Sequence, residues 1–330
     1  MNPILFLSPA VAFFCTFIMT SRWIPVAHKV GLVGIDMNKP TKPKVAEMGG
    51  IPLLGGVLGG ILSYIGINTF ILGQHSINLA LFAATSTILI IAFVGLVDDM
   101  LGWKIGLKQW QKPLLTIPAA LPMMVANLGK SVVSLPLMGD LELGALYPFL
   151  VVPIGIVGAS NGFNMLAGYN GLEAGMGIVI IATMSFVAYY TGSSWVAMMG
   201  IVTSASLVAF LYFNWYPARI FPGNMFTYMV GAIMACMAIL GNFEKLALLL
   251  FIPYYMDFLL PLRSRMKTEA FAKISADGSL EQPYDKIYDV THLSINIVKK
   301  VKNKVYEKDV TVSIIFFEVV LAIIGVIMYV

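Results

Sequence analysis

The chain has 330 residues, of which 58% are hydrophobic and only 12% are charged, and its formal net charge is +4 at pH 7. Because a soluble domain carries about 25% charged residues, this composition excludes an ordinary water-soluble protein. It predicts a single integral membrane domain over residues 1–330.

The apolar runs of the chain are separated by polar links that contain Gly or Pro. A bilayer core of about 30 Å is spanned by a helix of about 20 residues, so these runs predict an all-α integral membrane protein with about ten transmembrane helices. The first run has no basic residue before it and no small-residue cleavage site after it, which predicts that it is not a cleaved signal peptide. The expected spans are 3–21, 49–72, 79–97, 108–128, 144–160, 172–191, 195–213, 225–242, 245–262 and 311–329.

Lysine and arginine are distributed unevenly over the links between these spans. The links 22–48, 98–112, 161–171, 214–224 and 263–310 hold 19 of the 21 basic residues, and only Lys130 and Lys245 fall on the other side. Because basic residues concentrate on the cytoplasmic side of a membrane protein, these links are predicted to be cytoplasmic and both termini to be outside. The net charge then follows from topology, and nucleic-acid binding is not needed to explain it.

The predicted cytoplasmic links also carry the unusual polar residues. The second link opens with Asp98 and Asp99 directly after an apolar run. Adjacent carboxylates repel each other and are costly near hydrocarbon, so the pair either caps a membrane helix or handles a divalent cation and phosphate. Mg²⁺ prefers carboxylate and carbonyl oxygens together with substrate phosphates. Asn164 and Asn224 are candidate sources of further oxygens.

Three other features of these links have both a structural and a functional interpretation. Lys112, at the start of a predicted helix, either anchors that helix or binds a lipid phosphate. Arg263 and Arg265 either mark the cytoplasmic end of a span or bind a diphosphate. Phe221, before Pro-Gly, is either an interfacial aromatic residue or a stacking surface for a base.

The third link contains two Asn-Gly dipeptides and a further glycine, but no basic residue. Asn-Gly is a turn signal, and glycines also let a backbone approach a phosphate or a sugar closely. Two acids lie deeper, Asp257 near the inner end of the ninth span and Glu318 near the middle of the tenth. For both we expect structural pairing or a cavity-lining role.

These motifs, in this order, resemble those of the polyprenyl-phosphate N-acetylhexosamine-1-phosphate transferase family. Its bacterial members start peptidoglycan and O-antigen lipid intermediates, and its eukaryotic and archaeal members start N-glycan assembly on dolichyl phosphate. Asp98-Asp99 is similar to the family's aspartate pair, and residues 164–175 are close to the eukaryotic and archaeal form of a signature that bacterial members write with aspartates. Residues 34–39 and Glu47 are similar to the dolichol-type subgroup. The similarity covers essentially the whole chain and implies a ten-helix fold with an active site built from cytoplasmic loops.

The resemblance implies a role for each matched position. Asp98 and Asp99 would be catalytic together with Lys112, and Asp99, Asn164 and Asn224 would hold Mg²⁺, with Mn²⁺ as the alternative ion. Phe221 would stack on uracil, and the two arginines would hold the diphosphate. The full set for the nucleotide-sugar would be Ile35, Asp36, Met37, Glu47, Asn170, Phe221, Arg263, Ser264 and Arg265. The set for the lipid phosphate would be Lys112, Gly158, Asn161 and Asn164.

The sequence departs from the family pattern at two of these positions. The family usually has Asp at the position of Asn224, where Asn keeps an oxygen but loses a charge. It has His between the two arginines, where this chain has Ser264. The His-rich run of the bacterial peptidoglycan enzyme is absent, since His292 lies in the same loop but not at that motif. The peptidoglycan substrate is thereby disfavoured.

The expected reaction transfers N-acetylglucosamine-1-phosphate, or a related HexNAc-1-phosphate, from a UDP-sugar to a polyprenyl (dolichyl) phosphate and releases UMP. The alternatives are initiation of a cell-envelope glycan on undecaprenyl phosphate, a transporter or flippase, and a non-catalytic scaffold. We expect the protein in an archaeal cell membrane with a cytoplasmic active site. The expected partners are UDP-N-acetylhexosamine, the lipid phosphate and membrane lipids, with no nucleic acid and with a homodimer as an alternative to a monomer.

Overall fold

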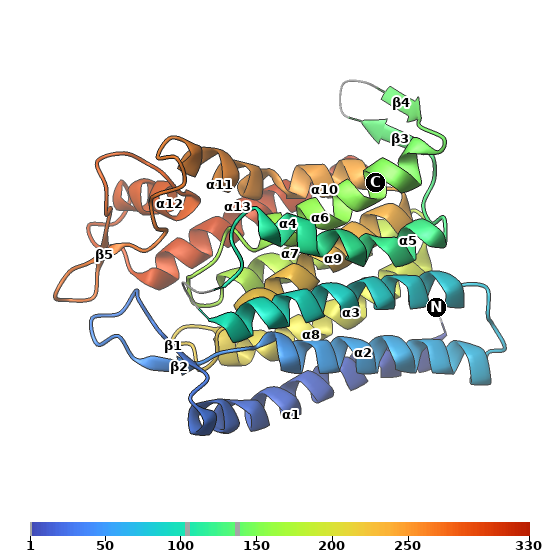
Figure 1. Cartoon of the computed structure of the whole chain (residues 1–330), viewed down its shortest axis with the longest axis horizontal. Helices are drawn as coiled ribbons and strands as arrows, with labels where there is room; N and C mark the ends of the chain where they lie inside the picture. The colour runs from blue at the N-terminus through green and yellow to red at the C-terminus, as the bar shows by residue number, and fades with distance from the viewer. Residues whose placement is uncertain (1, 103–105, 136–138) are drawn as a thin grey trace.

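The computed structural model describes residues 2–102, 106–135 and 139–330. Its long helices run side by side in one bundle, with short elements at both ends (Figure 1). The first half contains η1 (Pro3–Phe6), α1 (Leu7–Val30), β1 (Val33–Ile35), β2 (Lys44–Ala46), α2 (Gly50–Gly66), η2 (Ile67–Ile71), α3 (Asn78–Leu101), α4 (Gln111–Thr116), η3 (Ile117–Ala120), α5 (Leu121–Val125), β3 (Val132–Leu135), β4 (Gly139–Glu142), η4 (Tyr147–Val151) and α6 (Val152–Phe163). The second half contains α7 (Leu172–Tyr190), α8 (Ser194–Asn214), α9 (Gly223–Gly241), α10 (Glu244–Leu250), α11 (Ile252–Leu262), β5 (Lys273–Ile274), β6 (Leu280–Glu281), α12 (Val290–Lys299) and α13 (Glu307–Ile327).

Within the described residues, seven helices are long and apolar enough to cross a membrane. The pair α10 and α11, bent by 52°, is an eighth if it counts as one span, and η4 with α6 forms a shorter apolar helix. The structure thus confirms a mostly helical membrane protein. The expected number of about ten spans and the expected side of the termini stay predictions.

Two expected spans are interrupted by proline. The expected helix 108–128 is divided into α4, η3 and α5, with Pro118 and Pro122 in the first turns of the second and third pieces. The expected helix 245–262 breaks at Phe251, and Pro253 stands in the first turn of α11. Proline has no N–H and fits best in the first turn of a helix, where it removes no intrahelical hydrogen bond. Apolar periodicity therefore predicted where these segments lie but not where they break.

The two ends of the bundle differ. α3 continues to Leu101, so Asp98 and Asp99 lie in its last turn rather than after it. We call this end of the bundle the aspartate end; it also carries the β1–β2 and β5–β6 hairpins and α12 (Figure 1). The β3–β4 hairpin and both termini lie at the opposite end.

α9 is almost completely buried and packs against α3, α6 and α7. A Cβ added to Gly95 of α3 would lie 2.5 Å from Met225 Cα, and one added to Gly231 of α9 would lie 2.3 Å from the Ala159 carbonyl oxygen of α6. Small residues let membrane helices approach at backbone distance. α9 therefore lies at backbone distance from both α3 and α6, and this contact positions the site.

Candidate active site

Asp99 is directed at the beginning of α9. Its Oδ1 accepts a hydrogen bond from the Asn224 amide at 2.7 Å, and its Oδ2 accepts one from the Met225 amide at 3.0 Å. The first amides of a helix have no partner within the helix and carry the positive end of its dipole. Gly223 permits the contact, because its φ is +76° and a Cβ there would lie 2.7 Å from the Asp99 Oδ2. The Asp99 carboxyl group is thus held by two backbone amides.

Asp98 is buried and makes three contacts of a different kind. The Lys112 ammonium lies 2.9 Å from its Oδ2, and the Tyr228 hydroxyl donates to the same oxygen at 3.2 Å. The Leu107 amide donates to its Oδ1 at 2.8 Å. A buried carboxylate needs a counter-charge and hydrogen bonds, and α4 and α9 supply both. The structure therefore pairs two predicted catalytic residues, Asp98 and Lys112.

The first turn of α9 also reaches the end of α6. The Thr227 hydroxyl donates to Asn164 Oδ1 at 2.6 Å, and Asn164 directly follows the last residue of α6. Among the described hydrogen bonds, none involves the Asn224 side chain. Asp99 and Asn164 thus both contact the first turn of α9, which carries Asn224, the third predicted magnesium ligand.

These three residues form an oxygen-only donor set. The described residues contain no cluster of three His, Cys, Asp or Glu side chains that could hold a metal. A metal at this position would therefore depend on the Asp99 carboxylate and on the amide oxygens of Asn164 and Asn224. Such donors fit Mg²⁺, which binds one or two carboxylates together with water and substrate phosphates. Mn²⁺ accepts the same ligands.

The residues predicted to bind the lipid phosphate lie where α4 contacts α6. Asn161, in the last turn of α6, donates through Nδ2 to the Thr116 hydroxyl of α4 at 3.0 Å. Gly158, one turn earlier, is exposed, and a Cβ added to it would meet no atom within 4 Å. Lys112 begins the same α4 helix. No described atom thus covers α6 at Gly158, and binding of the lipid phosphate here stays a prediction.

The residues predicted to bind the nucleotide-sugar fall into three groups. Ile35 is 53% exposed and Met37 is half-buried, whereas Asp36 between them is buried. Asn170 is also buried, and its Nδ2 donates to the Asp36 Oδ2 at 3.2 Å. Asp36 and Asn170 therefore bind each other, and only their neighbours offer surface to a ligand.

Glu47 and Phe221 form the second group. The Phe221 amide donates to the Ala46 carbonyl at 2.8 Å, and the Gly49 amide donates to the Phe221 carbonyl at 3.0 Å. These bonds join the segment before α2 to the segment before α9. Burial raises the pKa of Glu47 above its ordinary value. Both side chains therefore lie at the aspartate end, next to the segment that leads into α9.

Arg263, Ser264 and Arg265 form the third group, directly after α11. Both arginines are exposed, and no ion pair among the described residues involves either one. The Ser264 hydroxyl bonds to the Pro261 carbonyl and to the Thr268 hydroxyl, both at 2.9 Å, so it fixes the turn that presents the arginines. No described contact joins this turn to Asp98 or Asp99.

Sequence reasoning missed several polar residues of this end. Thr227 and Tyr228 stand three and four positions after Asn224, which places them on its helix face, and this spacing was a usable signal. Lys39 and Glu307 are joined by an ion pair at 3.1 Å although 268 positions separate them, and no local pattern predicts that.

Of the two deep acids, Asp257 is paired as expected, because its Oδ1 accepts from the Val290 amide at 3.0 Å.

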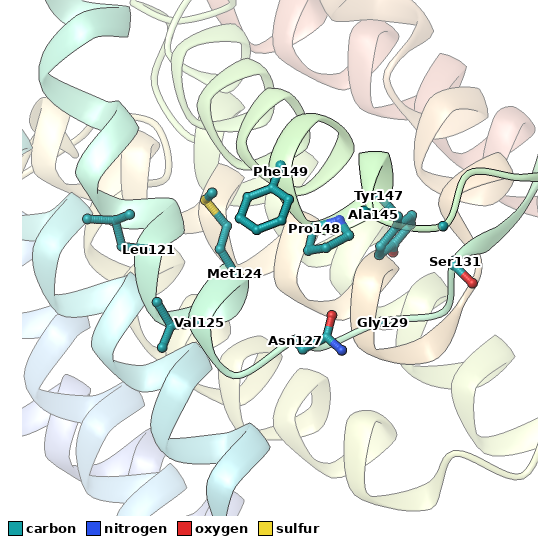
Figure 2. Close-up of a pocket in the computed structure, with 11 residues that line it drawn as sticks. Leu121, Met124, Val125, Asn127, Gly129, Ser131, Ala145, Tyr147, Pro148 and Phe149 are labelled. Carbon is teal, nitrogen blue, oxygen red and sulfur yellow. The ribbon is translucent and has the colours of Figure 1, made fainter.

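A cavity of about 710 Å³ lies at the opposite end of the bundle, between α5, η4 and the segment before β3 (Figure 2). Its wall is mainly apolar and includes Leu121, Met124, Val125 and Phe149, and none of its lining residues is charged. Phosphate chemistry needs charge or oriented donors, so this cavity does not compete with the aspartate end as the reaction site.

Comparison with known proteins identifies the family of the chain. The model of glycosyl transferase family 4 matches residues 81–242. A Saccharolobus solfataricus protein, provisionally named UDP-N-acetylglucosamine–dolichyl-phosphate N-acetylglucosaminephosphotransferase, is 34% identical over 96% of this chain and 94% of its own. A Dictyostelium discoideum protein with that name is 28% identical over 73% of this chain and 68% of its own. A Bacillus subtilis protein, named a probable undecaprenyl-phosphate N-acetylglucosaminyl 1-phosphate transferase, is 29% identical over 68% of this chain and 59% of its own. The chain belongs to glycosyl transferase family 4, a family of membrane enzymes that transfer sugar phosphates.

Proposed function

We propose that the protein transfers N-acetylglucosamine-1-phosphate from UDP-GlcNAc to a polyprenyl phosphate of the dolichyl type, releases UMP and so initiates a lipid-linked glycan for protein glycosylation. One observation carries the proposal: Asp99 on the first amides of α9 lies next to the Asp98–Lys112 ion pair. The names of the Saccharolobus and Dictyostelium relatives describe the same reaction.

The reaction brings two anions together, so charge neutralisation is its main requirement. In the proposed mechanism Lys112 turns from Asp98 to the acceptor phosphate, while Arg263 and Arg265 bind the diphosphate of the nucleotide-sugar. Mg²⁺ held by Asp99, Asn164 and Asn224 would add positive charge at that diphosphate. The acceptor oxygen then attacks the sugar-linked phosphorus in line, and UMP leaves.

Proton transfer is a minor part of this mechanism. A phosphate monoester has a second pKa of about 6, so the acceptor is largely ionised at neutral pH. No strong general base is therefore required. One aspartate of the pair would take any residual proton.

We place this chemistry on the cytoplasmic face of an archaeal cell membrane. The links of the aspartate end hold 19 of the 21 basic residues, which the positive-inside rule assigns to the cytoplasm. The Saccharolobus relative supports an archaeal setting. A cytoplasmic site also suits UDP-GlcNAc as the substrate, because a charged nucleotide does not cross the bilayer unaided.

A single assay tests the proposal. Purified full-length protein is given UDP-GlcNAc with either dolichyl or undecaprenyl phosphate, each with Mg²⁺ or with EDTA, and UMP and lipid-linked sugar are measured. We expect UMP release that needs Mg²⁺, prefers dolichyl phosphate and equals the amount of lipid-linked product. Preference for undecaprenyl phosphate would favour the bacterial-type reaction. Absence of UMP release with either lipid would contradict the proposal and leave a flippase or a scaffold.

A further inference from the structure

Lys39 is a buried lysine to which the mechanism above gives no role. It is 9% exposed, and its ammonium contacts Asp36, the Asn170 Oδ1 at 2.7 Å and the Glu307 Oε2 at 3.1 Å. It also lies 4.7 Å from the ring centre of Tyr216. A lysine is almost never buried without partners, and here every partner is polar or aromatic. We call Lys39, Asp36, Asn170 and Glu307 the Lys39 cluster.

The members of the Lys39 cluster come from parts of the chain that are far apart in sequence. Asp36 and Lys39 belong to the segment between β1 and β2, Asn170 to the turn before α7, and Glu307 to the first turn of α13. The Asn170 amide donates to the Glu307 Oε1 at 2.8 Å. The Ala218 amide donates to the Asn170 Oδ1 at 2.8 Å, which adds the segment before α9. The ammonium thus joins three segments of the aspartate end, and Asn170 joins a fourth to them.

The charges explain why this arrangement depends on Lys39. Asp36 and Glu307 are 3% exposed each, so two acids are buried around one cation. Removing one member of a buried charge cluster leaves its partners uncompensated, which costs far more than losing an exposed ion pair. Without Lys39 the two carboxylates would repel each other, and the segments that carry them would separate.

The segments joined by the Lys39 cluster are those that carry the predicted nucleotide contacts. Asp36 stands between Ile35 and Met37, whose side chains reach the surface. Ala218 stands three residues before Phe221, whose amide bonds to the residue before Glu47. Lys112 is on α4, which no bond of the cluster reaches.

We propose that Lys39, together with Glu307, is a positioning residue that assembles the nucleotide-binding half of the site and leaves the lipid-phosphate half unaffected. This inference rests on the proposed function for its substrate. It assigns Lys39 no contact with the reacting atoms.

The kinetic test compares Lys39→Met with Lys302→Met in purified full-length protein. Lys302 is the matched control, because it also pairs with an acid of α13, Asp309 at 2.5 Å, but is 57% exposed. In Lys39→Met the KM for UDP-GlcNAc should rise about tenfold or more, while the KM for the lipid phosphate stays within about twofold. Lys302→Met should change neither. An equal rise in both KM values, or no rise, would overturn the inference.

Two further measurements keep the test decisive. If Lys39→Met does not fold, Glu307→Gln takes its place and should show the same separation of KM values. Hydrogen exchange of residues 166–172 and 214–222 reports on the assembly without any substrate. It should accelerate in the cluster variant and not in Lys302→Met, and unchanged exchange would refute the inference. A wild type that does not use UDP-GlcNAc would refute the proposed function alone, since exchange is measured independently.

Discussion

Asp99 is positioned by backbone atoms, which makes its geometry sensitive to one glycine. Both of its oxygens accept amide hydrogen bonds from the first turn of α9. Gly223 precedes those amides in a left-handed conformation and leaves room for the carboxylate. A side chain at Gly223 would both strain the backbone and displace Asp99.

We predict that Gly223→Ala lowers kcat about 100-fold or more, because a shift of about 1 Å in a reacting group has that effect. Gly192→Ala is the matched control: its φ is +87°, but a Cβ there meets no atom within 4 Å. The control should lose about 1–2 kcal/mol of stability through the same backbone strain and keep its activity. Steady-state rates and thermal unfolding of both variants check this, and equal activities would refute it.

Asn224 leaves the predicted metal site with one carboxylate. We predict that Asn224→Asp lowers the Mg²⁺ concentration for half-maximal activity about tenfold, because a second carboxylate strengthens binding of a hard cation. Without metal the added charge repels Asp99, so the variant should unfold at a lower temperature in EDTA than in Mg²⁺. A Mg²⁺ titration of activity and of unfolding measures both effects. An unchanged titration would show that this position does not contact the metal.

At the scale of elements, the sequence predicts more of the helices than of their connections. Each expected span corresponds to a helical segment, because an apolar run of this length is stable only when it is buried as a helix.

The grouping of Asp98, Lys112, Asn164 and Asn224 at one end was also predictable, since all lie in links on one side of the membrane. The Lys39 cluster was not predictable as a whole, because its ion pair with Glu307 joins segments that only the packing of α13 brings together. The breaks at Pro118 and Phe251 depend on local hydrogen bonding that an apolar pattern does not contain.

The attachment of α12 to α11 depends on two buried acids. Asp289 caps α12 by accepting from the Thr291 amide at 2.8 Å, and Asp257 of α11 accepts from the neighbouring Val290 amide at 3.0 Å. Burial raises the pKa of Asp289 above its ordinary value. The native protein therefore holds protons that the unfolded chain, with a pKa of about 3.9, has already released. The stability that Asp289 contributes is therefore lost as the pH rises through its pKa in the native protein.

We predict that Asp289→Asn reduces this loss, since Asn caps a helix equally well but does not ionise. As the pH rises above the unfolded-state pKa of about 3.9, the wild type should lose stability that the variant keeps. Asp277→Asn is the control, because the nearby Lys304 lowers the pKa of the exposed Asp277 carboxyl, so it is ionised over this whole range. Thermal unfolding at several pH values tests this, and parallel pH profiles for wild type and Asp289→Asn would contradict it.

At the scale of the whole molecule, the bundle separates a basic end from an end that carries both termini (Figure 1). We predict that a maleimide that cannot cross membranes labels Gln74→Cys in intact cells and labels Asp277→Cys only after the cells are opened. Both positions are exposed and lie at opposite ends of the described bundle, and the native Cys236 is buried. Cys15→Ala serves as the background. Labelling of Asp277→Cys from outside would reverse the proposed orientation.

The most direct test of the proposed reaction centre replaces Asp98 and Asp99 separately by Asn in purified enzyme. Each variant keeps the shape of the side chain but removes the charge that pairs with Lys112 or with the first amides of α9. Asp277→Asn, an exposed acid of the same end, is the control. We predict that both active-site variants lose about 100-fold or more of UMP release from UDP-GlcNAc, while the control keeps its rate. Full turnover in Asp98→Asn and in Asp99→Asn would contradict the proposed reaction centre.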